Sequence, residues 1–351
     1  MTPRMVDVAR RANVALSTVS YALNGTRPVS PSTQRRILRA MEELGYRPNA
    51  LARGLASKRT HILALLFPTP ERGLGVTEME FVAGAADAAR ERGYHLMFSP
   101  SEVHNIRELE QLTGQGLIDG ALVMEVRLDD DRVDLLTQAG LPFSMIGRTS
   151  DPGSISYADI DFEQTTRDAV AHLVGLGHRC IGFLNHSPSA FTVGYGPTVR
   201  SAEGFRHAAA AAGIEHVERL CGDNATAGKA ALHELRATIP GLTALVVMND
   251  RAVVGVMDAL EEIGWRVPAD FSIVSIVSST HVTEMVRPKL TTLEPPSSEL
   301  GRLGVQMLID ELETTGDEPR SPTQVVLPCR LIVGGSSGPA PARQDERPHN
   351  R

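Results

Sequence analysis

The chain has 351 residues, a formal net charge of −7 and 42% hydrophobic residues, enough for two or three domains with buried cores. Its three cysteines form no CxxC pair, which argues against a disulfide scaffold and favours a reducing compartment. The sequence shows no signal-peptide pattern and no uncharged run of membrane-spanning length, so we expect a cytoplasmic protein with no membrane partner.

Charge is distributed unevenly along the chain. Residues 1–60 hold eleven Lys or Arg and three Asp or Glu, a net charge of +8, whereas the remainder carries −15. Because binding to phosphates requires cations, this asymmetry predicts that double-stranded DNA binds at the N-terminal end.

The N-terminal segment is predicted to be helical. Two short helices joined by a tight turn are expected within residues 6–24, with Asn13 in a left-handed conformation at the turn. A third helix follows between Ser30 and Gly45, which are suited to cap its two ends. The candidate core comprises Val8, Ala9, Ala12, Val14, Val19, Ala22, Leu23, Ile37, Leu38, Met41 and Leu44. Residues 1–47 are therefore predicted to form a helix-turn-helix DNA-binding domain.

The second helix is expected to enter the major groove. The residues expected to read base edges are Leu16, Ser17 and Tyr21. The residues expected to contact the DNA backbone, together with the arginines, are Thr18, Ser20 and Asn24. The alternative is that Leu16 and Tyr21 only pack within the head.

Residues 48–59 are predicted to form a linker helix, which Asn49 can cap. It is marginal in isolation, since helices shorter than about 12 residues are rarely stable. Leu51 and Leu55 share one face, so a leucine could wedge between base steps in the minor groove. The alternative is an ordinary linker whose leucines pack on the next domain.

From His61 onward, apolar runs alternate with amphipathic segments. A first series contains strands 61–67, 94–98, 120–124 and 142–146 and helices 78–92, 106–115 and 130–139. A second contains strands 180–184, 243–248 and 271–277 and helices 162–176, 199–212, 227–239 and 250–263, followed by segment 291–315 and a late strand 324–333. This alternation predicts two doubly wound parallel-sheet lobes.

Cofactor and catalytic motifs are missing from the sequence. No GxGxxG or GxxxxGK[ST] motif opens either series, so no nucleotide cofactor is expected. The spacing of His172, His178 and His186 fits no compact metal site, and structural roles are favoured for them. No GxSxG elbow supports a serine hydrolase, so we expect a non-enzyme.

The head and linker contain a dense, ordered set of residues: Asp7-Val8-Ala9, Val14, Ser17-Thr18-Val19-Ser20, Leu23-Asn24-Gly25, Val29-Ser30, Thr33, Ile37, Ala40, Leu44-Gly45-Tyr46-Arg47-Pro48-Asn49-Ala50, Ala52-Arg53 and Leu55. In these residues the chain resembles the lactose/galactose repressor (LacI/GalR) family of bacterial transcription regulators.

For DNA binding, the resemblance implies that the linker is a hinge helix that folds on operator DNA in a dimer. Leu55 would open a central base step, and the candidate contacts in this segment are Asn49, Ala52, Arg53 and Leu55. Leu16, Ser17 and Tyr21 fall on the family's base-reading positions. The chain departs from the pattern at Tyr21, where Arg is common, and at Ala15, where Ser is common.

The large domain is also similar to the family's effector domain. Matching segments are His172-Leu173, Leu176-Gly177-His178-Arg179, Met248-Asn249-Asp250, Val267-Pro268, Pro288-Lys289-Leu290-Thr291-Thr292-Leu293 and Glu299-Leu300-Gly301. The resemblance implies a fold like that of periplasmic sugar-binding proteins, with two lobes, three crossovers and a ligand cleft. In residues 60–335, the N-lobe would comprise about 60–157 and 291–319, and the C-lobe about 158–290 and 320–335.

The candidate effector-binding residues come from the same comparison. They are Phe67, Thr69, Asp161, Arg200 and Asn249, with Glu125 and Arg148 added from their positions at strand ends. Arg200 stands one residue earlier than the family's ligand-binding Arg. Val277-Ser278-Ser279 stands where an acidic residue often follows the strand.

The predicted function is that of an allosteric transcriptional regulator, primarily a repressor. A homodimer would bind a near-palindromic operator on the nucleoid, and a sugar or sugar derivative in the cleft would control it. The alternatives are a corepressor-type regulator responding to a purine or a phosphoprotein, a solute-binding protein, and an enzyme with a DNA-binding appendage. Residues 336–351 are expected to be disordered and lack a leucine heptad, which favours a dimer over a tetramer.

Overall fold

A computed structural model describes residues 3–24, 27–46, 59–67, 74–100, 114, 116–314 and 321–341. The helical head and the large domain are separate compact units and are treated in turn. None of the described helices has the length and apolar character needed to cross a bilayer.

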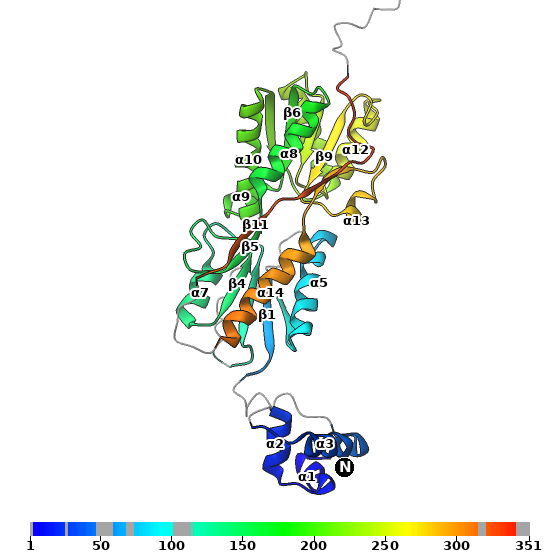
Figure 1. Ribbon diagram of the computed structural model, residues 1–351. Helices are drawn as coiled ribbons and strands as arrows, with labels where there is room; N and C mark the ends of the chain where they lie inside the picture. Colours follow the sequence, from blue (N-terminus) through cyan, green and yellow to red (C-terminus); the bar gives the residue numbers. More distant parts are fainter. Residues whose placement is uncertain are drawn as a thin grey trace, which may run out of the picture. The chain divides into compact units, whose positions relative to one another are not determined.

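The head contains three helices: α1 (Met5–Ala12), α2 (Leu16–Asn24) and α3 (Pro31–Leu44) (Figure 1). Asn13 has φ 50° at the turn, Ser30 accepts a hydrogen bond from the Thr33 N–H, and Gly45 ends α3 with φ 63°. The fully buried core comprises Val8, Ala9, Ala12, Val19, Ile37 and Ala40. Leu38, predicted to join it, is instead 54% exposed, because its neighbour Ile37 occupies the inward face of α3.

The N-lobe is built on a six-stranded sheet with the order β11-β5-β4-β3-β1-β2. Its strands are β1 (Ile62–Phe67), β2 (His95–Pro100), β3 (Gly120–Met124), β4 (Phe143–Ile146), β5 (Tyr157–Ile160) and β11 (Gln324–Leu327). The pairs β1/β3, β3/β4, β4/β5 and β5/β11 are parallel. Helices α5 (Val76–Glu91), α7 (Asp131–Ala139) and α14 (Ser297–Glu313) accompany this sheet, and α14 packs along α5 (Figure 1).

The C-lobe is built on a second six-stranded sheet with the order β12-β10-β9-β8-β6-β7. Its strands are β6 (Cys180–Asn185), β7 (Glu215–Leu220), β8 (Ala244–Val247), β9 (Ser272–Ile276), β10 (Thr291–Glu294) and β12 (Arg330–Ile332). Only the described β10/β12 pair is antiparallel. Its helices are α8 (Phe162–Gly175), α9 (Pro188–Thr192), α10 (Gly196–Ala212), α11 (Ala225–Thr238), α12 (Val253–Glu262) and α13 (Thr280–Thr283).

The chain passes between the lobes three times, as the resemblance implied. The passages follow β5, β10 and β11, so the lobe boundaries lie slightly later in the chain than expected. The single strand predicted over residues 324–333 is two strands, because β11 pairs with β5 in the N-lobe and β12 pairs with β10 in the C-lobe. The carboxyl ends of the parallel strands in both sheets therefore approach the space between the lobes.

The segment after Gly335 packs on the C-lobe, so the expectation of disorder from residue 336 is wrong for residues 336–341. Ser336 Oγ accepts from the Thr291 N–H at 2.8 Å and donates to the Ile273 carbonyl at 2.6 Å. The Gly338 carbonyl accepts from Ser272 Oγ at 3.2 Å. Backbone and hydroxyl hydrogen bonds, which composition does not reveal, hold this polar segment in place.

Candidate DNA-binding face and interlobe cavity

One face of α2 presents the residues predicted to read DNA. Leu16 is 49% exposed and Ser17 is exposed, while Val19 is buried on the opposite face. Tyr21 is half-buried, and the guanidinium carbon of the exposed Arg27 lies 5.2 Å from its ring centroid. This face therefore combines an apolar tip, a hydroxyl and a cation, which suits contact with base edges and phosphates.

Only some of the other predicted DNA contacts lie among the described residues. Thr18 and Ser20 are half-buried on α2. The described residues do not include Asn49, Ala52, Arg53 and Leu55, nor the side chain of Asn24. The hinge helix therefore stays a prediction.

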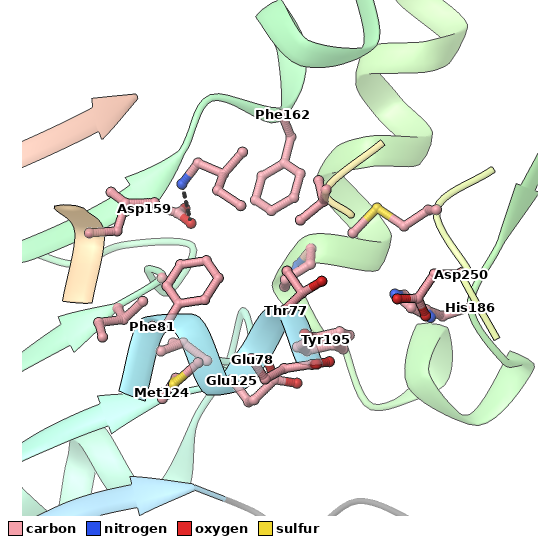
Figure 2. Close-up of a pocket in the computed structure, with 18 residues that line it drawn as sticks. Thr77, Glu78, Phe81, Met124, Glu125, Asp159, Phe162, His186, Tyr195 and Asp250 are labelled. Atoms are coloured by element: carbon pink, nitrogen blue, oxygen red, sulfur yellow. Dashed lines mark hydrogen bonds between the residues drawn. The ribbon is translucent and has the colours of Figure 1, made fainter. Parts of the chain in front are cut away.

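The interlobe cavity lies between the two lobes and holds about 710 Å³ of space, part of it open to solvent (Figure 2). Its polar lining comprises Thr77, Glu78, Glu125, Asp159, His186, Tyr195 and Asp250. The other lining residues are Phe81, Met124, Val126, Ile146, Gly147, Ile160, Phe162, Pro197, Met248, Val277 and Leu300. Among these lining residues there is no Lys or Arg, so hydrogen-bond acceptors and apolar faces dominate the wall.

The N-lobe wall is fixed by a buried ion pair. Arg132 Nη2 lies 2.7 Å from Asp130 Oδ2, and both side chains are almost fully buried. The same guanidinium donates to the carbonyls of Leu66, Met124 and Glu125, which ties the ends of β1 and β3 together. Glu125 has φ 56°, a strained value for a residue with a side chain. Arg132 therefore holds Glu125 in an unusual conformation at the cavity wall.

Asp159 is a second acidic lining residue, and its carboxylate is paired from both lobes. Arg148 Nη1 of the N-lobe lies 3.0 Å from Asp159 Oδ2, and Arg200 Nη1 of α10 lies 4.0 Å from it. Burial raises the pKa of Asp159 more than the two guanidinium charges lower it. Arg200 Nη2 also donates to the Thr149 carbonyl at 3.0 Å, so Arg200 joins the lobes beside the cavity.

Amide hydrogen bonds to the backbone hold one loop of the C-lobe wall. Asn249 donates through Nδ2 to the carbonyls of Cys221 (3.0 Å) and Gly222 (3.3 Å), and its Oδ1 accepts from the Ala252 N–H. Asn249 is 1% exposed, so this side chain fixes the loop that carries Asp250 into the cavity.

A backbone contact closes one side of the cavity. The Leu128 N–H donates to the Gly194 carbonyl at 2.7 Å, and the Gly196 N–H donates to the Val126 carbonyl at 3.1 Å. A Cβ on Gly196 would lie 2.9 Å from that carbonyl oxygen, so the close approach requires glycine. The two lobes are thus in direct contact at Arg127 and Tyr195, which form an antiparallel bridge.

The predicted effector residues occupy several positions relative to the cavity. Glu125 lines it, whereas Arg148 and Arg200 reach it only through Asp159. Asp161 caps α8 by accepting from the Gln164 N–H, and Phe67 is fully buried with its ring centroid 6.1 Å from that of Phe98. Asn249 bonds to the carbonyls of Cys221 and Gly222 and does not line the cavity. Thr69 lies outside the described residues.

Of the polar lining residues, sequence reasoning identified Glu125 and missed Thr77, Glu78, Tyr195, Asp159, His186 and Asp250. The signal that could have found the last two is topological, because each follows a buried parallel strand at its carboxyl end. Asp159 was missed because β5 was not predicted.

Comparisons with known proteins agree with both units. Residues 4–49 match "Bacterial regulatory proteins, lacI family", and residues 170–337 match "Periplasmic binding protein-like domain". The HTH-type transcriptional regulator CelR of Thermobifida fusca is 33% identical over 340 residues, which are 94% of this chain and 97% of CelR. The chain belongs to the LacI family of bacterial regulatory proteins.

Further relatives place this LacI-family chain among transcriptional regulators. Catabolite control protein A of Priestia megaterium is 30% identical over 313 residues, 88% of this chain and 92% of that protein. A solved CelR–cellobiose complex is similar with a TM-score of 0.70 and 29% identity, covering 95% of this chain and all of that chain. The lac repressor dimer bound to operator has the same fold, with a TM-score of 0.78 at 24% identity, over 96% of this chain and 100% of that one.

Proposed function

We propose that this LacI-family regulator is a repressor that binds a near-palindromic operator as a homodimer and is controlled by a sugar in the interlobe cavity. The observation that carries the proposal is the cavity wall, in which carboxylates alternate with aromatic and aliphatic faces. Carboxylates accept hydrogen bonds from hydroxyls, and apolar side chains pack against the C–H faces of a sugar ring. The similar CelR chain is solved in complex with cellobiose, which supports a sugar as the class of ligand.

The DNA side of the proposal rests on the exposed face of α2 and on the basic head. Two such heads, related by a dimer axis, would read half-sites about one helical turn apart. The hinge residues Asn49, Ala52, Arg53 and Leu55 are proposed to order on the minor groove, as the sequence predicts. We further propose that the protein works on the nucleoid and does not turn its ligand over.

Selection of bound sequences from random DNA with the full chain tests DNA recognition. The expected result is a near-palindromic motif. Ser17→Ala should relax the preference at a few positions, while Arg53→Ala should weaken binding to all sequences alike. Leu55→Ala should weaken operator binding without changing ligand affinity. Enrichment of no motif by the wild-type chain would overturn the proposal.

A thermal-shift screen tests ligand control, with cellobiose, ribose, adenine, guanine and glucose 6-phosphate as probes. A sugar is expected to raise the unfolding midpoint and to change operator affinity by about 5–150-fold, the usual range of allosteric coupling. Stabilisation by a purine base instead would favour a corepressor-type regulator. Consumption of the stabilising sugar would contradict a purely regulatory role.

A further inference from the structure

His186 is the first residue after β6 and lines the cavity from the C-lobe side, where Asp250 also lies (Figure 2). Its backbone is fixed on both sides. The His186 N–H donates to Asn185 Oδ1 at 2.8 Å, and its carbonyl accepts from the Cys221 N–H at 3.1 Å. Asn185 is itself held, because its Nδ2 donates to the Thr198 carbonyl at 2.8 Å. The backbone that carries the His186 side chain is therefore held in one position.

The imidazole ring is also oriented by its neighbours. Nδ1 lies 3.4 Å from Asp223 Oδ1, and the ring centroid is 6.1 Å from that of Tyr195. Asp223 is not a lining residue, whereas His186 and Tyr195 are. Nδ1 of His186 is thus directed toward a residue outside the lining, while His186 itself belongs to the cavity wall.

A second histidine of the C-lobe shows what a purely structural role looks like. His178 is fully buried, and both of its ring nitrogens are within hydrogen-bond distance of protein atoms, Thr243 Oγ1 and the Gly338 carbonyl. His178 does not line the cavity, and its environment holds the C-terminal segment. His186 is also held by hydrogen bonds, but unlike His178 it lines the cavity. A side chain that is fixed by its neighbours and borders a cavity is suited to bind a ligand.

The contact with Asp223 determines which ring nitrogen of His186 carries the proton in the neutral imidazole. A carboxylate that accepts from Nδ1–H stabilises the tautomer whose Nε2 is a hydrogen-bond acceptor. Figure 2 shows the carboxylates of Asp159 and Asp250 on opposite sides of the cavity. Donors on a ligand, such as sugar hydroxyls, complement an imidazole acceptor and carboxylates together, while phosphate or carboxylate groups would be repelled.

We propose that His186 binds a hydroxyl of the effector through Nε2 and that Asp223 is the positioning residue for its ring. The effector class is an uncharged polyhydroxylated molecule. This inference rests on the proposed function, because it concerns the ligand of the same cavity.

Two isosteric substitutions separate the ring nitrogens. Gln places an amide near the position of Nε2, whereas Asn places it near Nδ1. Calorimetry with cellobiose, ribose and glucose is expected to show at least about a tenfold loss of affinity in His186→Asn, equivalent to about 1.4 kcal/mol. His186→Gln should stay within about threefold of the wild type, and Asp223→Asn should fall between the two.

The matched control is His233→Asn on α11, where the side chain is exposed and distant in sequence from the lining residues. It should bind sugar like the wild type. Each variant must also retain its unfolding midpoint and its operator affinity, so that a folding defect cannot imitate the effect. Unchanged sugar affinity in His186→Asn would overturn the inference and leave the proposed function standing.

Two further outcomes are distinguishable. Failure of all three sugars to bind the wild-type chain would contradict a sugar effector, and this inference with it, while operator binding would still stand. Tighter binding of glucose 6-phosphate than of glucose would overturn the uncharged ligand class.

A spectroscopic measurement tests the positioning role of Asp223. In protein labelled with ¹⁵N-histidine, sugar binding should shift the Nε2 resonance that disappears in His186→Gln. Asp223→Asn should change the balance of tautomers at His186 before any ligand is added. An unchanged tautomer pattern in Asp223→Asn would contradict the positioning role.

Discussion

The two walls of the interlobe cavity hold their polar residues by different chemistry. In the N-lobe, buried carboxylates are paired with guanidinium groups, as in Asp130–Arg132 and Asp159–Arg148. In the C-lobe, Asn185 and Asn249 act through amide hydrogen bonds to backbone atoms. Removing one partner of a buried ion pair leaves a charge without its counter-ion, whereas removing an amide costs only hydrogen bonds. Substitutions in the N-lobe wall should therefore lower the free energy of unfolding more than substitutions in the C-lobe wall.

The largest expected effect is that of Arg132→Leu. The change leaves Asp130 buried without its partner and frees the carbonyls at the ends of β1 and β3. We expect the free energy of unfolding to fall by about 3–5 kcal/mol in urea denaturation. Arg302→Leu is the control, because Arg302 pairs with Glu91 on the solvent side of α14 and α5. Equal losses in both variants would contradict the special role of the buried pair.

Asn185→Ala should have a smaller effect on the C-lobe. It removes the bond to the Thr198 carbonyl and leaves the His186 N–H without its acceptor. The expected loss is about 1–3 kcal/mol by the same measurement. A loss as large as that of Arg132→Leu would break the contrast between the two walls.

As the pH falls, the C-lobe should lose stability at a higher pH than the N-lobe. Burial lowers the pKa of His172 and of His178. Below about pH 6.5 the unfolded chain then binds more protons than the folded one, so stability falls as the pH drops toward the folded pKa. Burial raises the pKa of Asp130, but the hydrogen bonds and charge of Arg132 outweigh it and lower the pKa overall. Its contribution is therefore lost only below about pH 4.

Hydrogen exchange measured lobe by lobe between pH 7.5 and 5, corrected for intrinsic rates, checks this order. Protection should decrease first in β6, β8 and β9. Earlier loss in β1 and β3 would contradict it.

The smallest effect is expected for Glu80→Gln. Glu80 pairs with His281 of α13 across the lobes at 3.0 Å, but the His281 side chain is 77% exposed. Solvent screens such pairs, so unfolding free energy should change by less than about 1 kcal/mol and sugar affinity by less than about twofold. A tenfold change in calorimetry would show that this exposed contact controls lobe closure.

The accuracy of the sequence predictions follows the strength of the local signal. Asn13, Ser30 and Gly45 were predicted in their roles because turn and cap chemistry is local. The strands β1 and β3 were predicted from continuous apolar runs, and β9 from an apolar run that contains two serines. β5 was missed because it is short and contains Asp159, and β7 because charged residues fill a half-exposed strand at the sheet edge.

The cavity was harder to predict, because it is assembled from both lobes. Asp161 was predicted to bind the effector, but it caps α8, whereas Asp159, which was not predicted, lines the wall. His186 was grouped with His172 and His178 as structural, and nothing in the spacing of the three histidines distinguishes it. The distinction depends on which side of β6 faces the space between the lobes, a property of tertiary packing.

The docked segment 336–340 has a practical consequence for handling the protein. A chain shortened to end at Gly335 would lack Ser336 and Gly338. Three buried residues of the C-lobe, Thr291, Ser272 and His178, would then each lose a hydrogen bond. Affinity tags and fusion partners are therefore better joined after Pro341 than immediately after the last strand.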